Sequence, residues 1–191
     1  MSVIDGCRRD CSASWRTFFE IYGPIVYRYA RHARLAACDA DDVVANVMRN
    51  FMQALRRGFT VDHSVGRFRY YLRKMTNHEI SALWRRQSRT RSADLDVTPA
   101  SQDTEPAPDK YWADIERQER LRICLERLRQ SPAVRARDML AFERYALSGE
   151  PADLVARDLG LSASRVYAIK HEVTCHLRKV RKHLDTILGE V

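Results

Sequence analysis

Residues 151–170 restrict the fold of this chain more than any other segment, because they combine two short helical patterns with a glycine between them. The first pattern has an apolar face made of Leu154, Val155 and Leu159. Pro151 suits the first turn of this helix, and Gly160 can adopt the left-handed backbone that ends it. Ser162 is a good N-cap for the helix that follows. The spacing predicts a helix-turn-helix, a motif that places its second helix in a DNA groove, whereas an ordinary helical hairpin is the alternative.

The second helix of this motif separates apolar from polar side chains. Val166 and Ile169 occupy positions that face inward. The residues on the other faces are predicted to contact DNA, and they are Ser164, Arg165, Tyr167, Ala168, Lys170 and His171.

The charge of the chain favours a polyanionic partner. Its 33 Lys and Arg against 25 Asp and Glu give a formal net charge of +8. Within residues 66–91 eight basic residues accompany one acid, Glu79, and a second basic cluster covers residues 165–183. The length of 191 residues and the 45% hydrophobic content suffice for one medium or two small packed domains.

The cysteines and the N-terminal residues indicate a cytoplasmic protein. Five cysteines, an odd number without the close pairing of a disulfide framework, fit reduced thiols. Charged residues precede any apolar run, and no segment approaches the roughly 20 apolar residues that a bilayer requires. We therefore expect no signal peptide and no contact with a membrane.

The pattern as a whole predicts an all-α protein, with two small helical domains joined by a flexible linker. Three prolines among Ser, Thr, Gln and acidic residues mark residues 92–110 as the linker. The domains then span residues 12–91 and 111–187. A linker of this length reaches on the order of 25 Å, so the domains could engage separate sites on one partner.

Three helices are expected in the first domain. Gly23 and Pro24 are predicted to bend or restart the first one. Asp39 is predicted to cap the second, whose inward face includes Val43 and Val47. The other face of this second helix is polar and carries Asp42, Asn46, Arg49 and Gln53.

The third helix combines basic and aromatic side chains. Tyr70, Tyr71 and Trp84 lie among the arginines of residues 66–91, a mixture that suits a phosphate backbone and unpaired bases. Core packing is the alternative for Tyr71 and for Trp84. A solvated basic helix usually interleaves acids, which this one almost lacks.

Neither a catalytic site nor a metal site is expected. The aspartates of residues 39–42 cluster where helix caps favour acids, and no distant His or Glu completes an acid-base or two-metal arrangement. The Cys and His side chains of residues 171–176, and the pair Cys7 and Cys11, lack tetrahedral zinc spacing. The sequence therefore predicts no enzyme activity and no cofactor.

A helix-turn-helix after a linker, with a basic and aromatic helix before it, resembles the two-domain sigma factors of the extracytoplasmic-function type. These proteins direct bacterial RNA polymerase to promoters. Residues 39–44, DADDVV, look like the acidic opening of the family's helix that binds polymerase core. Residues 68–72, FRYYL, followed by Arg85 and Arg86, are similar to the family's promoter-melting helix.

The resemblance implies a role for each cluster. Core polymerase would be bound by Asp39, Asp42, Val43, Asn46, Val47, Arg49, Asn50 and Gln53. Recognition and melting of the minus-ten element would depend on Arg67, Phe68, Arg69, Tyr70, Tyr71, Lys74, Arg85 and Arg86. Residues 58–67 would capture a flipped base, and the helix-turn-helix would read the minus-thirty-five element. The implied partners are the β′ and β subunits of polymerase core and promoter DNA, while an anti-sigma factor is left open.

Some positions depart from the family's pattern, and two other classes of protein remain open. Ala45 and Asn46 stand where Gln and Glu are usual, and His78 stands where Asn is usual. A dimeric helix-turn-helix repressor would bind no polymerase core and would leave the basic and aromatic helix unexplained. An enzyme acting on DNA would need catalytic groups for which the sequence provides no pattern.

Overall fold

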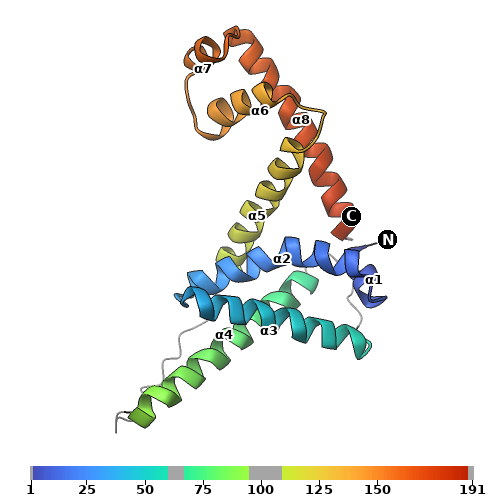
Figure 1. Cartoon of the computed structure of the whole chain (residues 1–191), viewed down its shortest axis with the longest axis vertical. Helices are drawn as coiled ribbons and strands as arrows, with labels where there is room; N and C mark the ends of the chain where they lie inside the picture. Colours follow the sequence, from blue (N-terminus) through green and yellow to red (C-terminus); the bar gives the residue numbers. More distant parts are fainter. Residues whose placement is uncertain (1, 60–66, 95–108, 189–191) are drawn as a thin grey trace. The chain divides into compact units, whose positions relative to one another are not determined.

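The computed structural model describes residues 2–59, 67–94 and 109–188, and every regular element in these ranges is a helix (Figure 1). The elements are α1 (Val3–Arg8), α2 (Ser12–His32), α3 (Ala37–Arg56), α4 (Arg67–Asp94), α5 (Asp109–Arg129), α6 (Ala136–Phe142), the π-helical turn η1 (Glu143–Leu147), α7 (Ala152–Leu159) and α8 (Ala163–Leu188). The prediction of an all-α fold is confirmed.

The chain divides into two compact units. The first unit comprises Met1–Glu119 and Ile187–Val191, and the second comprises Arg120–Thr186. The boundary thus falls within α5, whereas the sequence places the start of the second domain at residue 111. Both ends of the predicted linker are helical, since α4 ends at Asp94 and α5 begins at Asp109. The remainder of the linker lies outside the described residues.

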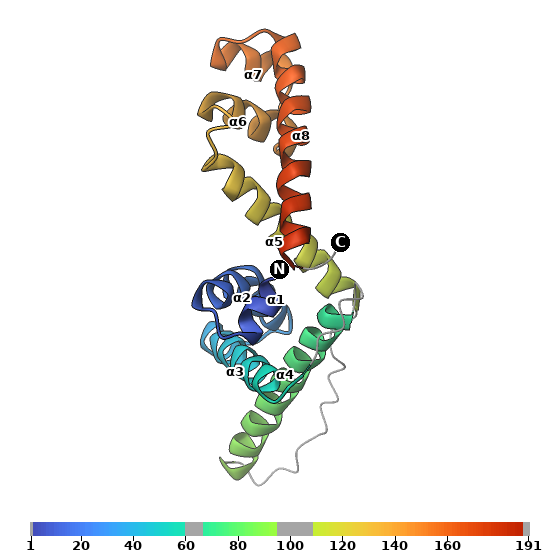
Figure 2. The ribbon, with the colours of Figure 1, turned by 90° about the vertical axis from the view of Figure 1, so that its right-hand side faces the viewer.

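Aromatic side chains build the core of the first unit, where α3 packs against α2 and α4 (Figure 2). The rings of Phe18 and Phe51 stack with their centroids 4.8 Å apart. Phe68 meets Tyr22 edge to face at 5.1 Å. The first contact joins α2 to α3, and the second joins α2 to α4. Tight aromatic packing therefore sets the distances of α3 and α4 from α2.

Helix α2 continues through Pro24, so the predicted restart is wrong, whereas a bend at this proline stays a prediction. A proline inside a helix costs roughly 3 kcal/mol, because it removes one backbone hydrogen bond and crowds the preceding turn. The helix nevertheless buries Ile21 before the proline and Ile25 and Val26 after it. Burial of both halves in the same core offsets the local cost.

The predicted cap of α3 is also wrong. The N-cap is Ala36, which has no side-chain hydrogen bond, and Asp39 lies inside the first turn. The Asp39 carboxylate instead accepts a hydrogen bond from Gln87 Nε2 of α4 at 2.9 Å. The Asp39 carboxylate therefore makes a tertiary contact and not the backbone cap that the sequence predicts.

The two helices and the glycine turn that the sequence predicts lie in the second unit, as α7 and α8. Gly160 ends α7 in the left-handed conformation, with φ 62° and ψ 42°. Ser162 Oγ accepts a hydrogen bond from the Arg165 N–H at 3.2 Å and so caps α8. Both features confirm the turn chemistry expected from the sequence.

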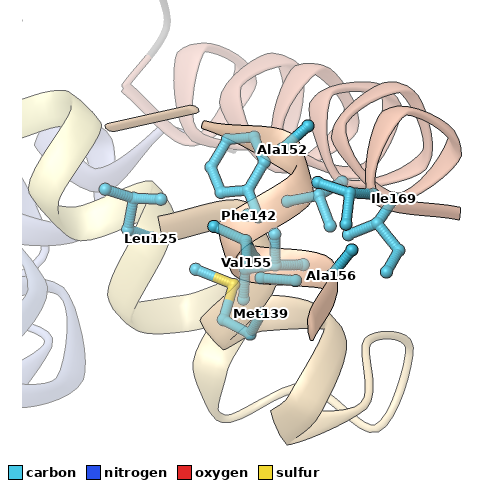
Figure 3. Close-up of a cluster of buried hydrophobic side chains, with 11 residues drawn as sticks. Leu125, Met139, Phe142, Ala152, Val155, Ala156 and Ile169 are labelled. Atoms are coloured by element: carbon cyan, nitrogen blue, oxygen red, sulfur yellow. The ribbon is translucent and has the colours of Figure 1, made fainter. Parts of the chain in front are cut away.

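The second unit has its own apolar core. In Figure 3 the side chains that converge from α5, α6, α7 and α8 include Leu125, Met139, Phe142, Val155 and Ile169. Val166 is buried as predicted, but Leu154 is 40% exposed and does not belong to the inward face. α7 is only eight residues long, and Ala152, Val155 and Ala156 fill its narrow contact stripe.

Candidate functional site

The predicted DNA-reading face of α8 is largely exposed. Tyr167 is 55% exposed, and Ser164, Lys170 and His171 are also exposed. Ala168 is half-buried. These side chains follow the glycine turn on the helix that a helix-turn-helix presents to DNA.

Arg165 differs from its neighbours, because two acids already hold its guanidinium. Its Nη1 lies 2.8 Å from Glu172 Oε1 on the same helix, and its Nη2 lies 3.1 Å from Asp138 Oδ2 on α6. The hydrogen bond with Glu172 raises the pKa of Arg165, with Asp138 adding to the effect. Asp138 is buried, so Arg165 links α6 to α8 in addition to lying on the predicted reading face. No local pattern in the sequence relates residue 138 to residue 165.

Tyr145 of η1 contacts the reading face, and sequence reasoning missed it. Its ring meets that of Tyr167 edge to face, with centroids 5.5 Å apart and an interplanar angle of 80°. Lys170 Nζ lies 5.3 Å from the centroid of the Tyr145 ring. An ammonium group at that distance from an aromatic face is attracted by the ring quadrupole.

Ion pairs fix the turn between η1 and α7. Arg144 Nη2 lies 2.6 Å from Glu150 Oε2 and 2.7 Å from Asp158 Oδ2. The hydrogen bond that Arg144 donates to Glu150 lowers the pKa of Glu150, and the hydrogen bonds that it donates to Glu150 and Asp158 raise the pKa of Arg144. Gly149 supplies the positive φ of 74° that this turn requires.

The basic face predicted for the first unit lies on α4. Tyr70 is 57% exposed, and the Arg73 guanidinium lies 5.3 Å from the centroid of its ring. Lys74, Arg85 and Arg86 are exposed as well. Arg67 begins α4, but its side chain and residues 60–66 of the predicted base-capturing loop lie outside the described part of the chain. The described face still combines cations with an exposed ring, as nucleic-acid binding requires.

Three predicted melting residues have structural partners. Phe68 is buried in the aromatic core, where it is not available to DNA. Tyr71 stacks on Phe59 with centroids 4.3 Å apart, which supports the packing alternative for this residue. Arg69 Nε lies 2.9 Å from Glu116 Oε1, a carboxylate of the same unit that is buried.

The predicted polymerase-binding face lies on α3. Asp42, Arg49 and Gln53 are exposed, and Arg49 Nη1 donates to Asn46 Oδ1 at 3.1 Å. Val43 and Val47 are buried and therefore stabilise the fold instead of offering contacts.

Asn50 joins the polymerase-binding face to α4. Its Nδ2 donates to Glu79 Oε1 at 2.9 Å. A shallow pocket of about 300 Å³ lies beside this contact, lined by Asn50, Gln53, Ala54, Arg57, Tyr71, Met75, His78 and Glu79. The predicted polymerase-binding and DNA-binding faces are therefore adjacent in the first unit.

No group of three or more potential metal ligands occurs within the described ranges. His171 Nε2 and Cys175 Sγ, which the sequence places one turn apart, lie 3.7 Å from each other. No helix in those ranges is both long and apolar enough to cross a membrane.

Comparison with known protein families gives one match. Residues 18–90 match the family model of sigma-70 region 2, which covers α2, α3 and most of α4. No curated protein and no solved structure matches the chain. The matched segment, which is less than half of the chain, is thus similar to region 2 of sigma-70 factors, a family that acts in transcription initiation by RNA polymerase. Proteins of that family are non-enzymatic regulators whose partners are polymerase core and promoter DNA.

Proposed function

We propose that this chain is a cytoplasmic sigma factor of the extracytoplasmic-function type, which binds RNA polymerase core and directs it to promoters. The match of residues 18–90 to sigma-70 region 2 carries the proposal. The helix-turn-helix of α7 and α8 supports a second DNA-binding unit downstream of that region.

In this proposal each unit has its own binding role. The exposed polar face of α3 binds polymerase core, and the cationic face of α4, with Tyr70, binds separated strands of the minus-ten element. The exposed face of α8 enters the major groove of the minus-thirty-five element. Strand separation follows from preferential binding of the open form, which is a population shift and needs no nucleotide hydrolysis.

Binding to polymerase core is the decisive test. The purified full chain is mixed with core polymerase of its own organism, and association is followed by native-gel titration. Transcription from DNA fragments of that organism is then measured with and without the chain. Association with core and transcription that depends on the chain would support the proposal.

A different result would favour the repressor alternative. In that case the chain would fail to bind core but would bind duplex DNA specifically as a dimer. Cleavage of DNA that a metal chelator suppresses would instead indicate an enzyme, and either result would overturn the proposal.

A further inference from the structure

We infer that Tyr145, which lies outside the helix-turn-helix, is a positioning residue for DNA recognition: its ring holds Lys170 and Tyr167 in the geometry that contacts the minus-thirty-five element. The inference rests on the proposed function, because it concerns the contact of α8 with promoter DNA. It adds a residue of η1 to a surface that sequence reasoning confined to α8.

Two contacts of one ring carry the inference. Lys170 and Tyr167 are three residues apart on α8, so their side chains lie on neighbouring positions of one helix face. The Tyr145 ring reaches both, at 5.3 Å from Lys170 Nζ and 5.5 Å from the centroid of Tyr167. Tyr145 itself is half-buried, whereas both of its partners are exposed. The ring therefore restricts two exposed side chains that would otherwise sample many rotamers.

The backbone that carries Tyr145 is itself fixed. Arg144, the preceding residue, pairs with Glu150 and Asp158 and so ties η1 to α7. On α8, Arg165 pairs with Asp138 of α6 and ties the start of the recognition helix to the same scaffold. Single π-helical turns occur frequently at functional sites, and this one places successive side chains toward α7 and α8. A side chain held on such a rigid support loses less freedom when it binds.

The inference predicts a specific order among variants of the full chain bound to polymerase core. Tyr145→Leu removes the ring but keeps apolar volume, and it should weaken promoter binding roughly three- to thirtyfold. Tyr145→Phe keeps the ring and should bind within about twofold of the unchanged chain. In a Lys170→Ala background, Tyr145→Leu should cost clearly less, because one of the two side chains that it positions is absent.

The probe is a duplex that the unchanged holoenzyme enriches from a randomised pool, and binding is measured by fluorescence anisotropy. Leu147→Ala, at a 48% exposed position of the same π-turn, is the matched control and should leave affinity unchanged. If the unchanged holoenzyme enriches no upstream element, the proposed function fails before Tyr145 is tested. If it does and Tyr145→Leu binds equally well, or loses the same factor with and without Lys170, the inference is overturned.

A second readout does not depend on how well the Leu variant folds. Reductive ¹³C-methylation of the lysines places methyl groups on Lys170 Nζ, and Lys170→Arg identifies their NMR signal. Because the ammonium lies over the Tyr145 ring, this signal should move upfield of the exposed Lys179 and Lys182 signals. A Lys170 signal at the same shift as those lysines would overturn the inference.

Discussion

Arg165 and Lys170 are both basic residues of α8, the helix proposed to read DNA, yet the structure gives them different surroundings. Arg165 compensates the buried carboxylate of Asp138, whereas the ammonium of Lys170 contacts only an aromatic ring among the described contacts. We expect Arg165→Gln to lower the melting temperature, because buried Asp138 loses the nearer of its two cations and keeps only Arg137, whose Nε lies 4.0 Å away. Lys170→Ala should change stability by less than about 0.5 kcal/mol and weaken promoter binding by about 1–3 kcal/mol.

Circular dichroism melts and anisotropy titrations of the holoenzyme check both expectations. An Arg165→Gln variant that melts like the unchanged chain but loses promoter binding would show that Arg165 contacts DNA directly. A Lys170→Ala variant with unchanged promoter binding would remove Lys170 from the reading face.

Tyr70 and Tyr71 are neighbours on α4 with opposite expected roles. Tyr71 stacks on Phe59, so Tyr71→Ala should lower the free energy of unfolding by about 1–2 kcal/mol. Tyr70 is 57% exposed, so Tyr70→Ala should leave the fold intact and reduce transcription from duplex templates while sparing pre-melted ones. Thermal melts combined with transcription from both templates distinguish the two roles. Equal activity of Tyr70→Ala on both templates would contradict a role in melting.

Individual residue roles could be predicted from the sequence only where the reason is local. The left-handed turn at Gly160 and the cap by Ser162 depend on a few neighbouring residues, and both are present. The Asp39 cap is wrong because α3 begins at Ala37, and the Asp39 carboxylate bonds instead to Gln87, which is 48 residues away along the chain. Spacing along one helix does not reveal such a partner, and the same limit hid the contacts of Tyr145.

At the scale of elements, the turn between η1 and α7 should respond to acid. The pKa of Glu150 is lowered from its ordinary value of 4.5 by the hydrogen bond with Arg144, so the folded chain binds this proton more weakly than the unfolded chain does. The stabilisation is complete above that ordinary value and is lost as the pH falls through the lowered value. Glu150→Gln should therefore lower the melting temperature at neutral pH, and this deficit should shrink in acid. A deficit of constant size at all pH values would contradict this account, and Glu20→Gln, at an exposed glutamate of the first unit, is the control.

The polar face of α3 gives the sharpest test of an element. The test variant changes Arg49 to Glu and Asn46 to Ala, two side chains that contact each other. Because Arg49 is exposed, the free energy of unfolding should change by roughly 0.5 kcal/mol or less. The double variant should still bind polymerase core more weakly, because a reversed charge in an interface opposes docking. Native-gel titration with core measures the effect. Unchanged core binding by a stably folded variant would show that this face is not the polymerase contact.

The types of element were easier to predict than their limits. Apolar periodicity gave the inward faces of α3 and α8, because burial along a helix repeats with the helix itself. The continuity of α2 through Pro24 was not predictable from local rules, since it depends on the aromatic core that both halves share. The limits of the compact units were not predictable either, because α5 contributes to both of them.

At the scale of the whole molecule, the proposed function requires two DNA-binding units that engage one promoter through one polymerase. Residues 100–108 lie in the segment between the matched region and the helix-turn-helix, and their role remains a prediction from the sequence. Their prolines and polar residues cannot form a packed core, so we expect them to act as a tether without sequence-specific contacts. A Gly/Ser segment of equal length should keep most promoter-dependent transcription, because both segments reach similar distances.

Deleting residues 100–108 should reduce transcription from promoters that need both elements, since a shorter tether cannot span them. Transcription by reconstituted holoenzyme measures each effect, and a circular dichroism melt verifies folding. Loss of transcription in the folded equal-length variant would show that this segment makes required contacts within the polymerase.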